Sequence, residues 1–194
     1  METLISERVY TVEEYLRIED ESLQKHEYHN GKIIPVSGAS FIHNAIAVNV
    51  LTALKIATRG QDSTYYVTNS DTKIWIEAIE RFVYPDVAVV SGAPYFFEKR
   101  KDIITNPLLV VEILSPGTQK KDRTSKFDPY RTLSSLKEYV LVDQDQSIVS
   151  IFSQADDWKE TKARGMNQYV NLTSTNTVLE LSDLYEGIDA LKNQ

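Results

Sequence analysis

Cysteine is absent from this sequence of 194 residues, and histidine occurs only at His26, His29 and His43. The lack of cysteine excludes disulfides, thiolate metal sites and a cysteine nucleophile, and it fits a reducing compartment. His26 and His29 stand on either side of Glu27, but no downstream histidine completes a zinc site, and Glu27 faces away from its immediate neighbours in a strand. The sequence therefore does not predict a zinc centre.

Long apolar runs and several common sequence fingerprints are also missing. No run approaches the ~20 apolar residues that a membrane-spanning helix needs. The first residues, Met-Glu-Thr-Leu-Ile-Ser-Glu, lack the basic and then apolar plan of a signal peptide. We find no phosphate-binding glycine loop, hydrolase nucleophile elbow or dinucleotide fingerprint. We therefore expect a cytoplasmic protein, and the absence of repeats and linkers predicts one domain over residues 1–194, with its core at about 11–153.

The chain as a whole holds more acidic than basic residues and has a formal net charge of −7. This balance argues against a general polyanion binder, because phosphate affinity comes largely from lysine and arginine. The window from Lys99 to Arg131 is different, since it holds eight basic and four acidic residues and is net +4. Two interpretations stay open: a solvated basic face, or a surface that contacts phosphates.

Local patterns predict a chain that mixes helices and strands. Thr11 and Glu14 form a capping-box pattern that opens a short helix through about Ile18. Asn30-Gly31 predicts a hairpin turn between strands at about 25–29 and 32–37. Apolar spacing predicts an amphipathic helix over 40–58. Further strands are expected at 64–68, 73–77, 81–90, 138–142, 148–152, 169–172 and 178–181, with a short helix near Leu184.

The central strand of the prediction is the apolar run at 106–116, which contains Pro107 near one end and Pro116 at the other. A short run rich in Leu, Val and Ile and bounded by proline is typical of a buried strand. Glu112 lies inside it, although glutamate is rarely buried without a partner. This carboxylate therefore needs a cation, a hydrogen-bond network or a proton. One alternative is a buried ion pair with Arg123 or Arg131.

Asp86 is the second acid placed on a predicted strand, directly after Pro85. Side chains alternate along a strand, so Asp86 shares a face with Ala88, and Glu112 shares one with Leu114. If the two strands are neighbours, Asp86 and Glu112 point into one cleft, where two carboxylates cannot both ionise cheaply. A Mg²⁺ ion would resolve this conflict. The alternative is that Asp86 is a turn acid that caps a backbone amide.

Lys126 lies in a predicted helix from Thr118 to about Leu133, which Pro129 must cap, kink or restart. It stands four residues after Asp122 and four before Tyr130, so the three share one helix face. A lysine aimed at the same cleft could orient the attacking water or stabilise developing charge. An exposed Asp122–Lys126 pair is the alternative.

Five motifs occur in one order along the chain: Glu27-Tyr-x-x-Gly-Lys-Ile-Ile, Pro-Asp86-Val-Ala-Val-Val, Val-Val-Glu112-Ile-Leu-Ser-Pro, Asp-Arg-x-x-Lys126-x-x-x-Tyr-Arg and Leu-x-Glu-Tyr-Val-Leu-Val-Asp143. Together they resemble the restriction endonuclease-like family of the PD-(D/E)XK nuclease superfamily, which is catalogued as a domain of unknown function. The resemblance covers about Thr11 to Gly187.

The resemblance implies an α/β fold of the α+β type, in which helices flank a central mixed β-sheet, with an N-terminal hairpin and a C-terminal β extension. It implies a site for Mg²⁺ or Mn²⁺ at Asp86 and Glu112, with Glu27 in support. The superfamily places lysine two residues after the second acid, but here Leu114 holds that position. The family resembles a migrated-lysine arrangement, and Lys126 is the matching residue. His43 matches a frequent family histidine near the cleft, or it packs at a helix start.

The sequence thus predicts a metal-dependent endonuclease that hydrolyses phosphodiester bonds in DNA. Asp86, Glu112, Lys126 and Glu27 are its candidate catalytic residues, and by analogy the protein pairs as a homodimer. The alternative is a module with a nuclease fold that binds nucleic acid or protein with weak or lost catalysis. The acidic net charge and Leu114 favour the alternative.

Overall fold

The structure, a computed structural model, describes residues 8–115, 127–188 and 191, and it shows a mixed α+β chain built from three sheets. The helices are α1 (Val12–Glu21), α2 (Phe41–Ala57), α4 (Phe127–Arg131) and α5 (Leu181–Leu184). The strands are β1 (His26–His29), β2 (Lys32–Pro35), β3 (Tyr65–Asn69), β4 (Lys73–Ile76), β5 (Arg81–Val83), β6 (Val87–Ser91), β7 (Ile103–Ile104), β8 (Leu109–Leu114), β9 (Glu138–Asp143), β10 (Ile148–Ser153), β11 (Glu160–Arg164), β12 (Tyr169–Leu172) and β13 (Thr177–Glu180). Two short 3₁₀ turns, Glu77–Ile79 and Gln154–Asp156, complete the elements.

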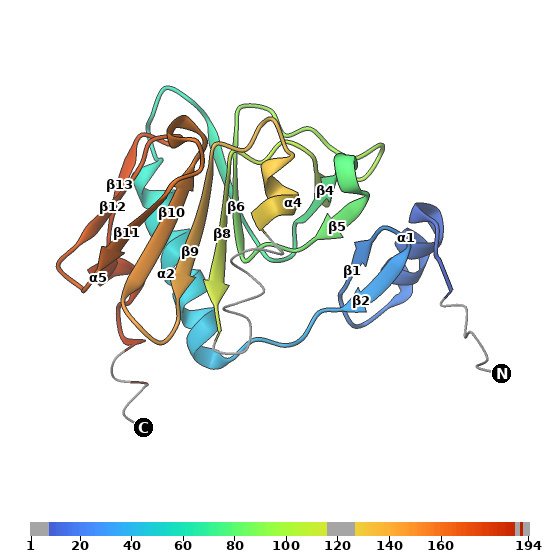
Figure 1. The fold of residues 1–194 in the computed structure, drawn as a ribbon, viewed down its shortest axis with the longest axis horizontal. Coiled ribbons are helices and arrows are strands. Elements are labelled where there is room, and N and C mark those ends of the chain that lie inside the picture. The colour runs from blue at the N-terminus through green and yellow to red at the C-terminus, as the bar shows by residue number, and fades with distance from the viewer. Residues whose placement is uncertain (1–7, 116–126, 189–190, 192–194) are drawn as a thin grey trace.

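The central sheet has six strands in the order β11-β10-β9-β8-β6-β3. It is mixed, because β8 and β9 run parallel while the other neighbouring pairs are antiparallel. Helix α2 lies on one face and α4 on the other (Figure 1). The architecture that the resemblance implied, a mixed sheet flanked by helices, is therefore confirmed.

Strand β8 is the middle of this sheet, and all six of its residues are buried. Leu109, Val111 and Ile113 pack with α2 in one apolar cluster. Val110 and Leu114 pack in a second cluster on the opposite face, which includes Tyr130 of α4. A strand covered on both faces has no polar side to alternate with its apolar side, which explains its continuous apolar run.

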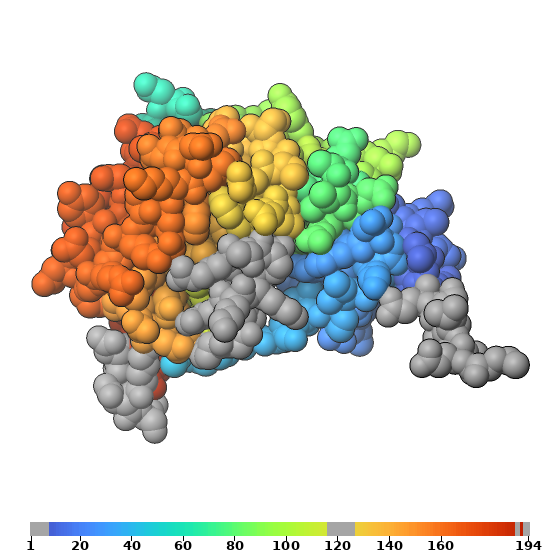
Figure 2. Space-filling model, in the orientation of Figure 1, coloured from blue at the N-terminus to red at the C-terminus, as the bar shows by residue number. Residues whose placement is uncertain are grey.

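A second sheet, β2-β1-β5-β4-β7, gathers the N-terminal hairpin beside the central sheet. Its core is aromatic, with Phe82 stacked on Tyr15 of α1 and close to Trp75. The ribbon in Figure 1 sets the hairpin apart from the rest of the chain, but β1 pairs with β5, and Figure 2 shows the two segments in contact at the surface. The chain passes from this sheet to the central one through Tyr84, Pro85 and Asp86.

Several local predictions are confirmed in atomic detail. The backbone N–H of Glu14 donates to Thr11 Oγ1 at 3.1 Å, and Glu14 Oε2 accepts from the backbone of Thr11 at 2.9 Å, which completes the capping box. Asn30 and Gly31 both have positive φ, as the two-residue hairpin turn requires. Ser40 caps α2 by accepting from the backbone of His43.

Other predictions need correction. The strand expected over 81–90 is two strands in different sheets, β5 and β6, because Pro85 cannot donate a ladder hydrogen bond and the chain leaves one sheet there for the other. The strands expected at 64–68 and 73–77 are present as β3 and β4, but they belong to different sheets, since β3 pairs with β6 and β4 pairs with β5 and β7. Strands β7 and β11 were not expected. Most of the helix predicted from Thr118 lies outside the described residues.

Among the residues that the structure describes, none of the helices has the length and apolar composition to cross a bilayer.

Candidate functional site

The pairing of β6 with β8 brings Asp86, which directly precedes β6, close to the strand that carries Glu112. The two strands are antiparallel neighbours in which Val87 faces Val111. Continuing this register by one residue sets Asp86 opposite Glu112. The side chain of Asp86 contacts His43 of α2, whereas the side chain of Glu112 contacts Tyr130 of α4 on the other face of the sheet. The neighbouring-strand condition of the prediction is therefore met.

The carboxylate of Asp86 is held by two groups. Its Oδ2 accepts the backbone N–H of Ile113 at 2.7 Å, and its Oδ1 lies 2.9 Å from Nε2 of His43. The alternative interpretation, an acid that caps a backbone amide, therefore also describes Asp86. The capping role and the metal-binding role are compatible. Each carboxylate oxygen has two lone pairs, and His43 and the backbone of Ile113 each contact one of the two oxygens. The side chain is 19% exposed, which leaves it within reach of solvent.

Glu112 is almost fully buried, with 2% of its surface exposed. The Tyr130 hydroxyl of α4 donates to its Oε1 at 3.1 Å. Burial raises the pKa of Tyr130, and the charges of Glu112 and Glu27 raise it further. Arg131, one of the two suggested ion-pair partners, instead approaches Asp128 at 3.6 Å and is nearly half exposed. Arg123 lies outside the described residues.

Glu27 approaches the same junction from β1. Its Oε2 lies 2.9 Å from Nε2 of His29, and its Oε1 accepts the backbone N–H of Tyr84 at 3.5 Å, two residues before Asp86. The negative charge of Glu27 also raises the pKa of Tyr130. Glu27 and His29 share a strand face because they are two residues apart, whereas His26 points away and contacts Glu19. Glu27 thus contacts the backbone two residues before Asp86, and its charge acts on the same tyrosine that donates to Glu112.

The sequence patterns did not predict which groups contact these carboxylates. Tyr130 was noted only as a face-mate of Lys126, and His29 only as a rejected zinc ligand. Tyr84 received no role, yet its hydroxyl donates to the buried Glu19 at 2.6 Å while its backbone meets Glu27. One signal could have pointed to it: Tyr84 directly precedes the Pro85-Asp86 dipeptide.

Lys126, the lysine assigned by resemblance, lies outside the described residues, as does Asp122. Leu114 lies within the described residues. It is 1% exposed and packs with Val110 and Tyr130. Its position in an apolar cluster explains why a lysine has no room two residues after Glu112.

A divalent ion fits the donors that are present. Mg²⁺ is usually bound by one or two carboxylates and keeps several waters, which the opposed Asp86 and Glu112 can satisfy. Within residues 8–115, 127–188 and 191, no group of three or more histidine, aspartate or glutamate side chains is arranged to hold a metal. Asp86 and Glu112 are therefore the carboxylates that could hold such an ion, and Glu27 is a third acid that contacts the backbone of Tyr84.

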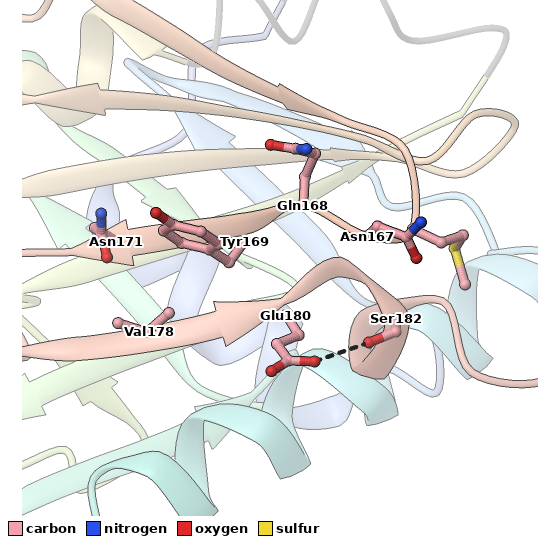
Figure 3. A pocket seen from close by; sticks show the side chains of 8 residues that line it. Asn167, Gln168, Tyr169, Asn171, Val178, Glu180 and Ser182 are labelled. Atoms are coloured by element: carbon pink, nitrogen blue, oxygen red, sulfur yellow. Dashed lines mark hydrogen bonds between the residues drawn. The ribbon is translucent and has the colours of Figure 1, made fainter.

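A hollow of about 540 Å³ lies elsewhere, on the outward face of β12 and β13. Figure 3 shows Tyr169 and Asn171 on one strand and Glu180 and Val178 on the other, with their side chains along this face. None of the predicted site residues lines it. The candidate site is therefore the junction around Asp86.

Comparison with known proteins agrees with this fold. The uncharacterized protein sll1609 of Synechocystis sp. is 33% identical over 175 residues, which cover 89% of this chain and 98% of that protein. A second Synechocystis protein, slr1290, is 36% identical over 145 residues, or 75% of this chain and 74% of its own. A crystal structure from Anabaena variabilis, described as a putative nuclease belonging to DUF820, superposes with a TM-score of 0.74 over 92% of this chain and 99% of that one, at 19% identity.

The motifs of the sequence, the mixed sheet and these relatives point to one group of proteins. The model of the Uma2 family, described as "Putative restriction endonuclease", matches residues 12–184. The chain therefore belongs to the Uma2 family of restriction endonuclease-like proteins.

Proposed function

We propose that this protein is an endonuclease that uses Mg²⁺ or Mn²⁺ to hydrolyse phosphodiester bonds in DNA. The observation that supports the proposal is the pairing of β6 with β8, together with the hydrogen bond of 2.7 Å that ties Asp86 to the backbone of the strand carrying Glu112. A divalent ion bound there would supply a hydroxide nucleophile and neutralise charge on the phosphate. Asp86 and Glu112 are the ligands in this proposal.

The remaining residues of the site position these two. Ile113 donates its backbone N–H to Asp86, so the strand that carries Glu112 also fixes the first ligand. Tyr130 donates its hydroxyl to Glu112 and limits the rotamers of that side chain. Glu27 would support the ion or its bound water. Lys126 takes the role of orienting the water or stabilising the transition state, as the resemblance implies.

DNA is the proposed partner, and the basic window offers it a contact surface. Lys99 and Lys101 are exposed or partly exposed on the loop before β7. Arg100, between them, is held by Asp20 and Asp102 and is not available for phosphate. We further propose that the protein acts in the cytoplasm, where DNA and Mg²⁺ occur together.

The test compares wild type with Asp86→Asn and Glu112→Gln on supercoiled plasmid, in the presence of Mg²⁺, Mn²⁺ or a chelator. Wild type should cleave only with the metal, and each variant should lose at least about a hundredfold in rate, the scale expected for loss of an electrostatic catalyst. Circular dichroism establishes that the variants fold. Metal-dependent cleavage that survives both substitutions would rule out the assignment.

Two observations favour a second function. Leu114 is buried where the superfamily keeps its lysine, and the chain is net −7. Both fit a nuclease-fold module that binds nucleic acid or protein without cleaving. This function predicts binding that weakens as salt rises and no cleavage with any divalent ion. Cleavage by the wild type separates the two functions, and Lys126→Ala should abolish that cleavage if the enzyme uses this lysine.

A further inference from the structure

A hollow of about 520 Å³ lies where three segments of the chain meet. These segments are residues 75–78 at the end of β4, residues 95–98 and 105–106 on either side of β7, and residues 132–135 after α4. The volume is within the range of sites that bind small molecules. Neither Asp86, Glu112 nor Glu27 lines the hollow. A ligand bound here would therefore be distinct from the substrate of the proposed nuclease.

Four aromatic side chains form a large part of the wall: Trp75, Tyr95, Phe96 and Phe97. Trp75 is 8% exposed, and its ring centroid lies 5.3 Å from that of Phe97, so these two rings belong to the packed interior of the second sheet. Tyr95 is 66% exposed and Phe96 is 42% exposed. The hollow therefore has an aromatic base that is fixed by packing and two further rings that are open to solvent.

The loop that presents Tyr95 is fixed by its own hydrogen bonds. The backbone N–H of Tyr95 donates to Asn106 Oδ1 at 2.7 Å, and Asn106 Nδ2 donates to the carbonyl oxygen of Ala93 at 3.1 Å. The backbone N–H of Thr105 donates to the carbonyl oxygen of Tyr95 at 2.9 Å. Because the backbone is already ordered, a ligand that covers the exposed rings would not have to order this loop on binding.

Two carboxylates complete the wall, Glu77 from the 3₁₀ turn after β4 and Glu98 from the loop before β7. Of the described residues that line the hollow, none is lysine, arginine or histidine. Within the described part of the chain, no ion pair or side-chain hydrogen bond engages either carboxylate. Lys99 and Lys101 follow Glu98 on the same loop, but they do not line the hollow. The wall thus combines aromatic rings with two negative charges from separate segments.

Aromatic faces and carboxylates both attract organic cations, because the face of an aromatic ring is the negative end of its quadrupole. An anionic ligand would be repelled by the two glutamates, and an apolar ligand would cover them without a partner. We propose that the hollow binds a small linear polyamine, whose ammonium groups pair with Glu77 and Glu98 and whose methylene chain lies on Tyr95 and Phe96. Two carboxylates on separate segments suit a ligand with more than one positive charge. The proposal is independent of the nuclease assignment.

Calorimetric titration of the full chain with spermidine at low salt tests the role of the carboxylates. Wild type should bind one spermidine per chain, and Glu77→Gln and Glu98→Gln should each raise the dissociation constant at least about fivefold. Glu80→Gln is the matched control, because Glu80 ends the same 3₁₀ turn and is exposed but does not line the hollow. It should bind as wild type does. No saturable binding by wild type would overturn the proposal, as would an equal loss in Glu80→Gln, which would indicate general attraction to a chain of net charge −7.

A second pair of variants tests the role of the rings. Tyr95→Leu keeps an apolar side chain but removes the aromatic face, so spermidine should bind at least about threefold more weakly. Because Tyr95 is mostly exposed, this variant should keep the thermal midpoint of the wild type. Tyr169→Leu, at a tyrosine of β12 that is 58% exposed and lies outside the hollow, is the control and should bind as wild type does. Unchanged affinity in Tyr95→Leu, or an equal loss in Tyr169→Leu, would overturn the aromatic part of the site.

Discussion

Two buried glutamates on neighbouring strands, Glu138 and Glu112, should respond differently to the same substitution. Glu138, at the start of β9, is 1% exposed. Its Oε1 accepts the backbone N–H of Thr173 at 2.9 Å and the hydroxyl of that residue at 3.0 Å. Its Oε2 accepts the backbone N–H of Ser174 at 3.1 Å and its hydroxyl as well. This carboxylate holds the turn between β12 and β13.

Glu138→Gln should destabilise the fold strongly. The amide replaces one accepting oxygen with a donating NH₂, which faces the backbone N–H of either Thr173 or Ser174. One hydrogen bond to a charged group is lost, worth about 1.5–3 kcal/mol, and a buried N–H is left without an acceptor, at a cost of about 1–3 kcal/mol. Because part of this cost is relieved by hydroxyl rotation, we expect a loss of about 2–4 kcal/mol in the free energy of unfolding. For a chain of this size the thermal midpoint should fall by about 5–15 °C.

Glu112→Gln should destabilise the fold less than Glu138→Gln, because an amide oxygen can still accept the Tyr130 hydroxyl, whereas the Glu138 carboxylate accepts from two backbone N–H groups. The same change should remove metal-dependent activity, whereas Glu138→Gln should keep it below the melting temperature of the variant. Urea unfolding followed by circular dichroism gives both free energies. If Glu112→Gln loses as much stability as Glu138→Gln, then Glu112 is a structural residue and the functional reasoning fails.

Three further predictions concern the rest of the fold. Gly31→Ala should destabilise by at least about 1 kcal/mol, because Gly31 has φ of 88° and an added Cβ would collide with Val9; Asn30→Ala is the comparison. Arg100→Lys should cost about 1 kcal/mol, because a lysine cannot reproduce the two-sided fork that ties Asp20 of α1 to Asp102; Lys101→Arg is the control. Alkaline pH should destabilise the protein, because burial raises the pKa values of Tyr15, Tyr84, Tyr130 and Tyr185 above their ordinary value of 10. Thermal melts measure the first two, and urea unfolding from pH 8 to pH 11 measures the third.

The sign of the pH effect follows from which state binds more protons. Below about pH 10 these tyrosines are protonated in both states, and they add no pH dependence. Above it the unfolded chain ionises first, so each tyrosine lowers stability by up to about 1.4 kcal/mol per pH unit. A stability that stays flat from pH 10 to pH 11 would contradict the burial of these hydroxyls. Variants at Gly31 or Arg100 that melt with the wild type would contradict the contacts assigned to them.

Local signals predicted much of this fold because their physics is local. The Thr11–Glu14 capping box and the Asn30-Gly31 turn each depend on a few neighbouring residues, and both are confirmed. The prediction that Asp86 and Glu112 face one cleft required their strands to be neighbours, and β6 and β8 are neighbours.

What the sequence did not reveal depends on contacts between distant segments. Nothing within residues 64–77 shows that β3 and β4 join different sheets, because that choice is made by β6, β5 and β7. Strand β11 is polar and half exposed, so no apolar pattern marks it. His43 lies 43 residues from Asp86, and Tyr130 lies 18 from Glu112. Such partners follow from the packing of α2 and α4 on the sheet, which periodicity does not specify.

We propose that Asp86 and Glu112 together bind a divalent ion. A crystal soaked in Mn²⁺ and examined by its anomalous scattering tests this proposal. We expect one anomalous peak per chain between the carboxylates of Asp86 and Glu112, and no peak in a Glu112→Gln crystal soaked in the same way. A peak at another place, or one that persists in Glu112→Gln with equal height, would show that these two carboxylates do not hold the ion.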